Sequence, residues 1–177
     1  AKTKLKIAEA LKFKTPVPVD QFTAKVIRHA TTSPDGKILA FSALGHLWMK
    51  KLPNGKPKRV TNSTLHEFEP AFSPDGKELS YVTWDDEEMG AIYKVAIKSG
   101  APVKLTNQKG IYRTPSYSGD GKMIVYQKEN GNSDQGRTFS KQTGIFVIST
   151  SGGEAKKVVG EGAFPLFNKD DSRIFYQ

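Results

Sequence analysis

The chain has 177 residues, a net charge of +9 and no cysteine. This length is enough to bury a hydrophobic core in one domain, and the lack of cysteine excludes disulfides, thiolate metal sites and cysteine nucleophiles. No run approaches the roughly 18 apolar residues that a membrane-spanning helix requires. The basic residues are spread over predicted turns without a nucleic-acid-binding signature, so we expect them on exposed strands and turns and predict no nucleic-acid partner.

Residues 1–27 precede the repeated part of the chain and form a predicted lead-in with one or two strands. The stretch Lys4–Phe13 has helical propensity, but its apolar residues also alternate as they do in a strand, so both structures remain open. The stretch Thr15–Val19 contains two prolines and must be extended, because each proline fixes its own φ and restricts the residue before it.

From residue 28 onwards, one pattern recurs four times: a short strand, a turn of the type Ser-Pro-Asp-Gly-Lys, and a second strand. In this turn, proline presets φ, aspartate accepts local backbone hydrogen bonds, and glycine supplies the position with positive φ. The turns start at Ser33, Ser73, Ser118 and Asn168, which are 40, 45 and 50 residues apart. The third turn has Gly119 in place of proline, and the fourth keeps only Asp170.

Two further strands follow the second strand in each of the first three copies, separated by tight turns that contain glycine or asparagine. Four antiparallel strands in a period of roughly 40–50 residues predict an all-β fold, a β-propeller with three complete four-stranded blades and a partial fourth. The predicted blades cover residues 28–61, 67–106, 112–159 and 162–177, and the predicted first strands are Ile27–Thr32, Glu67–Phe72, Tyr112–Tyr117 and Gly162–Phe167.

The fourth copy reaches only its second strand, predicted at Arg173–Gln177. Two hypotheses for the ring therefore stay open. A strand from the lead-in completes the last blade, or the fragment stays open and self-associates through its exposed edges.

Aromatic residues recur at fixed offsets in the second and third strands. We predict that they form the core between adjacent blades, because large apolar side chains at equivalent positions of a repeat meet in its stacked interfaces. These residues are Phe41, Tyr81, Tyr126, Trp48, Tyr93 and Phe146.

The stretch from Pro70 to Lys77 resembles the repeat of TolB-type propellers, a WD-repeat-like architecture. There, Pro-x-aromatic-Ser-Pro-Asp-Gly-Lys precedes an apolar strand, and a Leu-Thr pair like Leu105-Thr106 closes the repeat. The resemblance covers about residues 28–177. The succession Ile27–Trp48, His66–Pro70 and Val82–Glu87 is also similar to the TolB-like propeller that precedes the catalytic barrel in a group of large bacterial amidohydrolases.

This resemblance implies a periplasmic or otherwise extracytoplasmic bacterial location, although no signal peptide opens the chain. It also implies that a longer parent protein carries a metal-dependent hydrolase domain. The chain itself lacks the paired histidines of such a barrel and has neither a Gly-x-Ser-x-Gly elbow nor a Walker loop. We therefore expect no catalytic residue, metal site or cofactor within these 177 residues.

Candidate binding residues emerge when the first strands of the repeats are superposed, because these strands line the central channel of a propeller. Polar or charged side chains break the apolar pattern at Arg28, His29, Glu67, Glu69 and Arg113. One hypothesis is that they bind a protein or peptide partner, or a hydrolase domain of the same parent chain, in an interaction or substrate-gating module. The alternative is that they only meet water at strand ends. A rival functional hypothesis makes the propeller a hydrolase that uses carboxylates such as Glu67 and Glu69.

Overall fold

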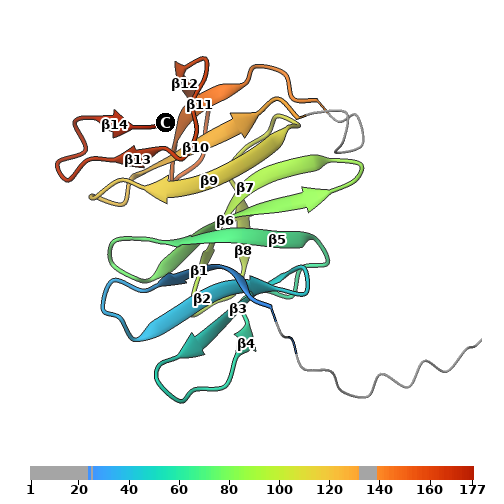
Figure 1. Cartoon of the computed structure of the whole chain (residues 1–177), viewed down its shortest axis with the longest axis vertical. Coiled ribbons are helices and arrows are strands. Elements are labelled where there is room, and N and C mark those ends of the chain that lie inside the picture. Colours follow the sequence, from blue (N-terminus) through green and yellow to red (C-terminus); the bar gives the residue numbers. More distant parts are fainter. Residues whose placement is uncertain (1–23, 25, 132–138) are drawn as a thin grey trace, which may run out of the picture.

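The computed structural model describes residue 24, residues 26–131 and residues 139–177 (Figure 1). The predicted lead-in over residues 1–27, and with it the hypothesis that a strand from this region closes the ring, lies almost entirely outside the described residues. Within the described part of the chain, every regular element is a β-strand.

The strands form three four-stranded antiparallel sheets and one two-stranded hairpin, which follow one another along the molecule (Figure 1). This arrangement confirms the predicted propeller with three complete blades and a partial fourth. Blade 1 contains β1 (Arg28–Thr32), β2 (Ile38–Ala43), β3 (His46–Lys51) and β4 (Lys58–Arg59). Blade 2 contains β5 (His66–Phe72), β6 (Glu78–Asp85), β7 (Met89–Ala96) and β8 (Pro102–Lys104). Blade 3 contains β9 (Ile111–Tyr117), β10 (Met123–Glu129), β11 (Gly144–Ser149) and β12 (Lys156–Val159), and the hairpin contains β13 (Leu166–Phe167) and β14 (Ile174–Phe175).

The last hairpin is shorter than the sequence predicts. The strand expected over Gly162–Phe167 is reduced to β13, and the one expected over Arg173–Gln177 is reduced to β14. These two strands pair only with each other among the described residues. Gly162, the first residue of the predicted strand, has a φ of 132°, which an extended strand does not adopt.

The first strand of every blade contains a bulge at the same place. In β5, Glu69 and Pro70 together face the single residue Tyr81, and the ladder resumes one residue out of step. The first bulge residue has left-handed backbone although it is not glycine, with φ of 51° at His29, 51° at Glu69, 47° at Thr114 and 51° at Phe164. Because this costly conformation recurs in all four copies, it belongs to the architecture of the blade. A proline follows in three copies, where its missing N–H leaves no donor unpaired in the bulge.

The Ser-Pro-Asp-Gly turns of successive blades stack on one another. A Cβ added to Gly76 of the second turn would lie 3.4 Å from Pro34 of the first, and one added to Gly121 of the third would lie 3.6 Å from Pro74 of the second. The two departures from the repeat meet at the next step of this stack. Gly119 stands where the third turn should have proline, and Asp171 stands where the fourth should have glycine. The Asp171 carboxylate accepts hydrogen bonds from the N–H groups of Gly119 (2.6 Å) and Asp120 (3.0 Å).

We expect Gly119→Pro and Asp171→Gly to be coupled. Gly119→Pro removes an N–H that Asp171 binds, and Asp171→Gly removes the acceptor, so each single variant should lose about 1 kcal/mol of unfolding free energy. The double variant restores the proline-on-glycine contact of the earlier turns, so its loss should be smaller than the sum of the two. A double-mutant cycle by chemical denaturation measures this coupling, and strictly additive losses would show that the two departures are independent.

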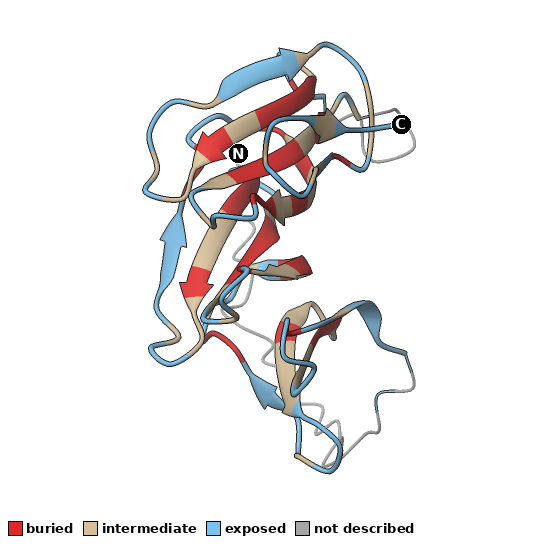
Figure 2. Ribbon diagram, turned by 90° about the vertical axis from the view of Figure 1, so that its left-hand side faces the viewer, coloured by how far each residue is buried: buried red, intermediate tan, exposed pale blue. Residues whose placement is uncertain are grey.

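The hydrophobic core lies between adjacent blades (Figure 2). One cluster joins blades 1 and 2 and includes Leu47 and Tyr81, and a second joins blades 2 and 3 and includes Ile92 and Tyr126. The predicted aromatic core is right for Tyr81, Tyr126 and Phe146, and Phe41 is buried as well, but Trp48 and Tyr93 are only half-buried. Trp48 pairs across the sheet with Phe41. Ala40 and Leu47 point towards blade 2, so their alternating neighbours Phe41 and Trp48 lie on the opposite face, where no described blade packs.

Candidate functional site

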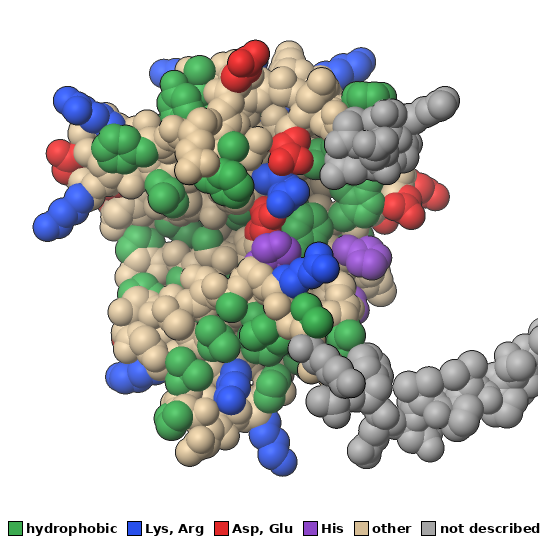
Figure 3. All heavy atoms as spheres, in the orientation of Figure 1, with side chains coloured by type: hydrophobic (Ala, Val, Ile, Leu, Met, Phe, Trp, Pro, Cys, Tyr) green, Lys and Arg blue, Asp and Glu red, His purple; other side chains and the backbone are tan. Residues whose placement is uncertain are grey.

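The first strands β1, β5 and β9 lie side by side in the middle of the face shown in Figure 1. All five predicted binding residues lie on these strands. In Figure 3, histidine side chains lie beside basic and acidic side chains near the middle of the same face. The structure brings the five residues to one region, but it gives them two different environments.

Glu67 is committed to the packing of blade 2 on blade 1. Its side chain is buried, and its carboxylate accepts hydrogen bonds from the backbone N–H of Leu47 (3.1 Å) and from the hydroxyl of Thr61. Its backbone N–H donates to the carbonyl of Gly45 at 2.8 Å. Glu67 therefore supplies acceptors that blade 1 needs, and its oxygens are occupied by this blade-to-blade contact.

Glu69 and Arg113 join blade 2 to blade 3. The Glu69 carboxylate accepts one hydrogen bond from Arg113 Nε and another from the N–H of Thr114, both at 2.6 Å. Arg113 Nη1 also lies 3.8 Å from the carboxylate oxygen Oε2 of Glu129. Charge-assisted hydrogen bonds of this kind are strong and directional, so the bulge that turns Glu69 out of β5 positions it to hold β9.

Arg28 and His29 line an open hollow of about 580 Å³ between blades 1 and 2. Within the described part of the chain, no carboxylate lies within 4.0 Å of the Arg28 guanidinium. Phe68 and Trp84 form an apolar wall, together with the exposed Leu44. The hollow therefore offers a solvent-accessible positive charge beside apolar and aromatic surface.

The hydrogen bonds of His29 define its tautomer. Ser42 Oγ donates to the carbonyl of Arg28 (3.1 Å), so it accepts from His29 Nδ1 at 2.8 Å. Nε2 then faces the Glu69 carboxylate at 3.9 Å. Partial burial lowers the pKa of His29, and Arg113 and Arg28 act in the same direction, whereas Glu69 opposes them. At neutral pH the imidazole is therefore uncharged, and Arg28 carries the positive charge of the hollow.

Three residues of the hollow were missed in the sequence. Ser42 and Trp84 lie on second strands, opposite Arg28 and His66 respectively, and only the first strands were compared for polar departures. His66 approaches the turn between β2 and β3, where a Cβ on Gly45 would lie 2.9 Å from its Nδ1. The short turn Leu44-Gly45 could have signalled this close approach, because glycine is favoured where another group packs against backbone.

The contacts of the two carboxylates give no support to the rival hydrolase hypothesis, since Glu67 and Glu69 each bind two donors of the chain itself. Across residues 26–131 and 139–177, no group of three or more histidine or acidic residues is arranged to hold a metal ion. The same part of the chain contains no helix long and apolar enough to cross a membrane.

Successive four-stranded antiparallel sheets packed face to face, with their first strands side by side, define an arc of a β-propeller. The family model described as the TolB beta propeller domain matches residues 18–177. The chain therefore belongs to the TolB beta propeller domain family, and the resemblance of its repeats to TolB-type propellers is confirmed.

Solved structures agree with this assignment at the level of the fold. The chain is 22% identical to a putative TolB from Agrobacterium tumefaciens, over 88% of this chain and 56% of that one, with a TM-score of 0.69. It is 21% identical to TolB from Acinetobacter baumannii, over 85% and 37%, with a TM-score of 0.65. An oligogalacturonate lyase from Vibrio parahaemolyticus matches at 12% identity over 84% and 45%, with a TM-score of 0.66. The chain thus spans about half or less of these proteins, and a search among curated proteins found no match.

Proposed function

We propose that this TolB-like propeller segment is a non-catalytic interaction module, and that its hollow between blades 1 and 2 binds a peptide segment with a carboxylate beside an apolar side chain. The observation that carries this proposal is the exposed Arg28 guanidinium, which stands without a carboxylate partner among the described residues and beside the wall of Phe68 and Trp84. A guanidinium recognises a carboxylate through paired donors, and the aromatic wall offers contact area to the neighbouring side chain.

Glu69 and Arg113 have a supporting role in this proposal. Their ion pair fixes β5 against β9 and places a negative charge near His29. Glu67 also lines this hollow, and its hydrogen bond from the N–H of Leu47 holds β5 against blade 1. The peptide then meets Arg28 and His29 directly, while the other three predicted residues hold the strands that present them.

Arg28→Ala is expected to weaken binding of a peptide containing Leu-Asp by about tenfold, because the variant loses a charge-assisted contact. The same peptide with Leu-Asn should bind the unmodified chain about tenfold more weakly than Leu-Asp. Lys37→Ala is a matched control, since it removes one exposed positive charge at the opposite end of β2. Titration calorimetry measures all these affinities. Equal affinity of Arg28→Ala and the unmodified chain would refute the proposed site.

The binding should also strengthen at acidic pH, once His29 becomes charged. The pKa of His29 lies below its ordinary value of 6.5, so the strengthening should begin only below about pH 6.5 and should reverse where the peptide aspartate, with an ordinary pKa of about 3.9, becomes protonated. His29→Gln should flatten this dependence, because glutamine keeps a donor but does not titrate. A pH dependence of the same size in His29→Gln would assign it to another group.

We further propose an extracytoplasmic location and a longer parent protein with a metal-dependent hydrolase domain, for which this propeller acts as a partner or gate. Both proposals are supported by the resemblance of residues 27–87 to the propeller of bacterial amidohydrolases. Fractionation of cells that express the whole parent protein tests the location, and a purely cytoplasmic distribution would contradict it.

A further inference from the structure

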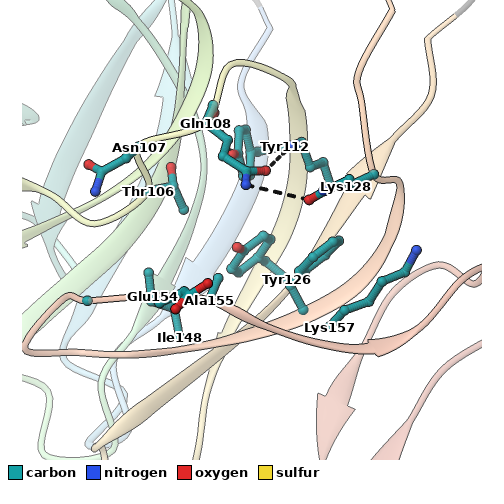
Figure 4. A pocket seen from close by; sticks show the side chains of 13 residues that line it. Thr106, Asn107, Gln108, Tyr112, Tyr126, Lys128, Ile148, Glu154, Ala155 and Lys157 are labelled. Carbon is teal, nitrogen blue, oxygen red and sulfur yellow. Dashed lines mark hydrogen bonds between the residues drawn. The ribbon is translucent and has the colours of Figure 1, made fainter.

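A second hollow, of about 600 Å³, opens between blades 2 and 3 and shares no lining residue with the first (Figure 4). The connection from β8 to β9 forms one side, through residues 106–108. The blade 3 strands β10 and β11 and the start of β12 form the other. Its volume is within the range of pockets that hold small organic ligands.

A buried lysine departs from the repeat at this hollow. Lys128 is 3% exposed. It stands two residues after Tyr126, and the equivalent positions after Phe41 and Tyr81 hold Ala43 and Thr83. The blade architecture therefore needs only a small uncharged side chain here, and the long cationic one in blade 3 requires another explanation.

The neighbouring backbone is adapted to this lysine. Gly110 precedes β9, and a Cβ at this position would collide with Cε of Lys128. Lys128 pairs across the sheet with Tyr112, whose ring centroid lies 5.6 Å from Nζ. Absence of a side chain at Gly110 thus leaves room for the lysine stem, and Tyr112 stabilises its charge through a cation–π contact.

The lysine amine keeps capacity for a further acceptor. Lys128 Nζ donates a hydrogen bond to the side-chain oxygen of Gln108 at 3.0 Å, and this amide is a neutral partner. Gln108 is itself held in place because its backbone carbonyl accepts a hydrogen bond from the Tyr112 hydroxyl at 2.6 Å. Burial lowers the pKa of Lys128. A buried ammonium is stabilised most by an anion, and the lining residues Lys157 and Glu154 leave the hollow with a net charge of only one positive unit when Lys128 is protonated.

The hollow has an aromatic wall next to the amine, of which little is exposed: Tyr126 is 2% and Phe146 is 6% exposed. The rings of Tyr126 and Phe146 are stacked with centroids 5.8 Å apart and planes 10° apart. Lys157 Nζ lies 5.9 Å from the Phe146 centroid and covers part of the wall. In Figure 4 the Tyr126 ring lies between Lys128 and the Glu154-Ala155 segment, so a flat ligand on this wall would have its edge within reach of the lysine.

We propose that this hollow binds a small monocarboxylate with a flat ring, which packs against the exposed parts of Tyr126 and Phe146 and places its carboxylate against Lys128 and the side chain of Gln108. The single net positive charge favours a monoanion over phosphate, since Glu154 repels a second negative charge. The inference does not depend on the peptide site between blades 1 and 2.

Benzoate is a suitable probe, and benzamide is its neutral analogue. Titration calorimetry of the chain should give a benzoate dissociation constant on the order of 1 mM, as its few heavy atoms allow, and at least about tenfold weaker binding of benzamide and of inorganic phosphate. Lys128→Met keeps the apolar stem and removes the charge, so it should weaken benzoate binding at least about tenfold. Lys98→Met changes an exposed lysine on a turn of blade 2 and should leave the affinity unchanged.

A second measurement on the unmodified chain covers the case in which Lys128→Met does not fold. Saturation-transfer NMR should show contacts from benzoate ring protons to Tyr126 and Phe146, and the Lys128 Nζ resonance should shift with its pKa raised by the anion. Equal affinity for benzoate and benzamide, benzoate binding unaltered by Lys128→Met, or no saturation transfer at 20 mM benzoate, roughly twenty times the expected dissociation constant, would each overturn the proposal.

Discussion

Tyr81→Ala is expected to lower the free energy of unfolding by about 3–5 kcal/mol. Tyr81 is fully buried between blades 1 and 2, where it packs with Leu47 and Val60 and stacks on Tyr93 with ring centroids 5.9 Å apart. It also faces the bulge formed by Glu69 and Pro70. Truncation therefore leaves a cavity in the contact that joins the first two blades, and the rigid strands around it can close it only in part.

Chemical denaturation measures this effect, and two variants calibrate it. Tyr81→Phe keeps the ring and should lose less than about 1 kcal/mol. Tyr176→Ala removes a tyrosine that is 48% exposed and should have a similarly small effect. A loss below 1 kcal/mol for Tyr81→Ala would mean that blades 1 and 2 do not pack as described.

Glu67→Ala should cost about 3 kcal/mol, although it replaces a charged residue by an apolar one. The change leaves the N–H of Leu47 and the hydroxyl of Thr61 without their acceptor inside the blade contact, and each buried donor left unpaired costs about 1–3 kcal/mol. Glu67→Gln should lie between alanine and the unmodified chain, because one amide oxygen replaces two carboxylate oxygens.

Glu78→Ala is the matched control for Glu67→Ala. Glu78 is partly exposed and pairs with Lys94 at 3.0 Å, so its loss should change the unfolding free energy by about 0–1 kcal/mol. The comparison separates a buried acceptor from an ordinary surface ion pair. If the two alanine variants were equally stable, Glu67 would have no structural role, and its carboxylate would return to the set of candidate functional groups.

The sequence predicts those parts of the fold that local chemistry determines. The turn type follows from proline, aspartate and glycine at fixed positions, and the first strands β1, β5 and β9 were predicted to within one residue of their observed bounds because the turns that follow them define where they end. The length of β13 was wrong, because it depends on how many strands pair with it. The left-handed backbone at Glu69 could not be predicted, because no glycine stands at this position. The bulge becomes visible only in the pairing of β5 with β6.

The sequence places the five candidate binding residues on the first strands, but it does not predict their contacts. Comparison of the repeats identified Glu67 and Glu69 as departures, yet their partners lie 20 and 44 residues away in other blades, where no local pattern connects them. Gly119 and Asp171 were likewise visible as two separate exceptions, and their hydrogen bonds emerge only when the turns stack. Lys128 escaped notice because a lysine near the end of a strand is usually exposed.

In the proposed division of roles, Arg28 and His29 form a ligand-binding surface, whereas Glu67, Glu69 and Arg113 hold the blades that carry it. Backbone amide NMR during titration with the Leu-Asp peptide tests this division most directly. We predict that the largest shifts occur at residues 28–29, 42–45 and 84, and that Arg28→Ala abolishes them while Lys37→Ala does not. Shifts confined to other surfaces, or the same shifts in Arg28→Ala, would contradict these roles of Arg28 and His29.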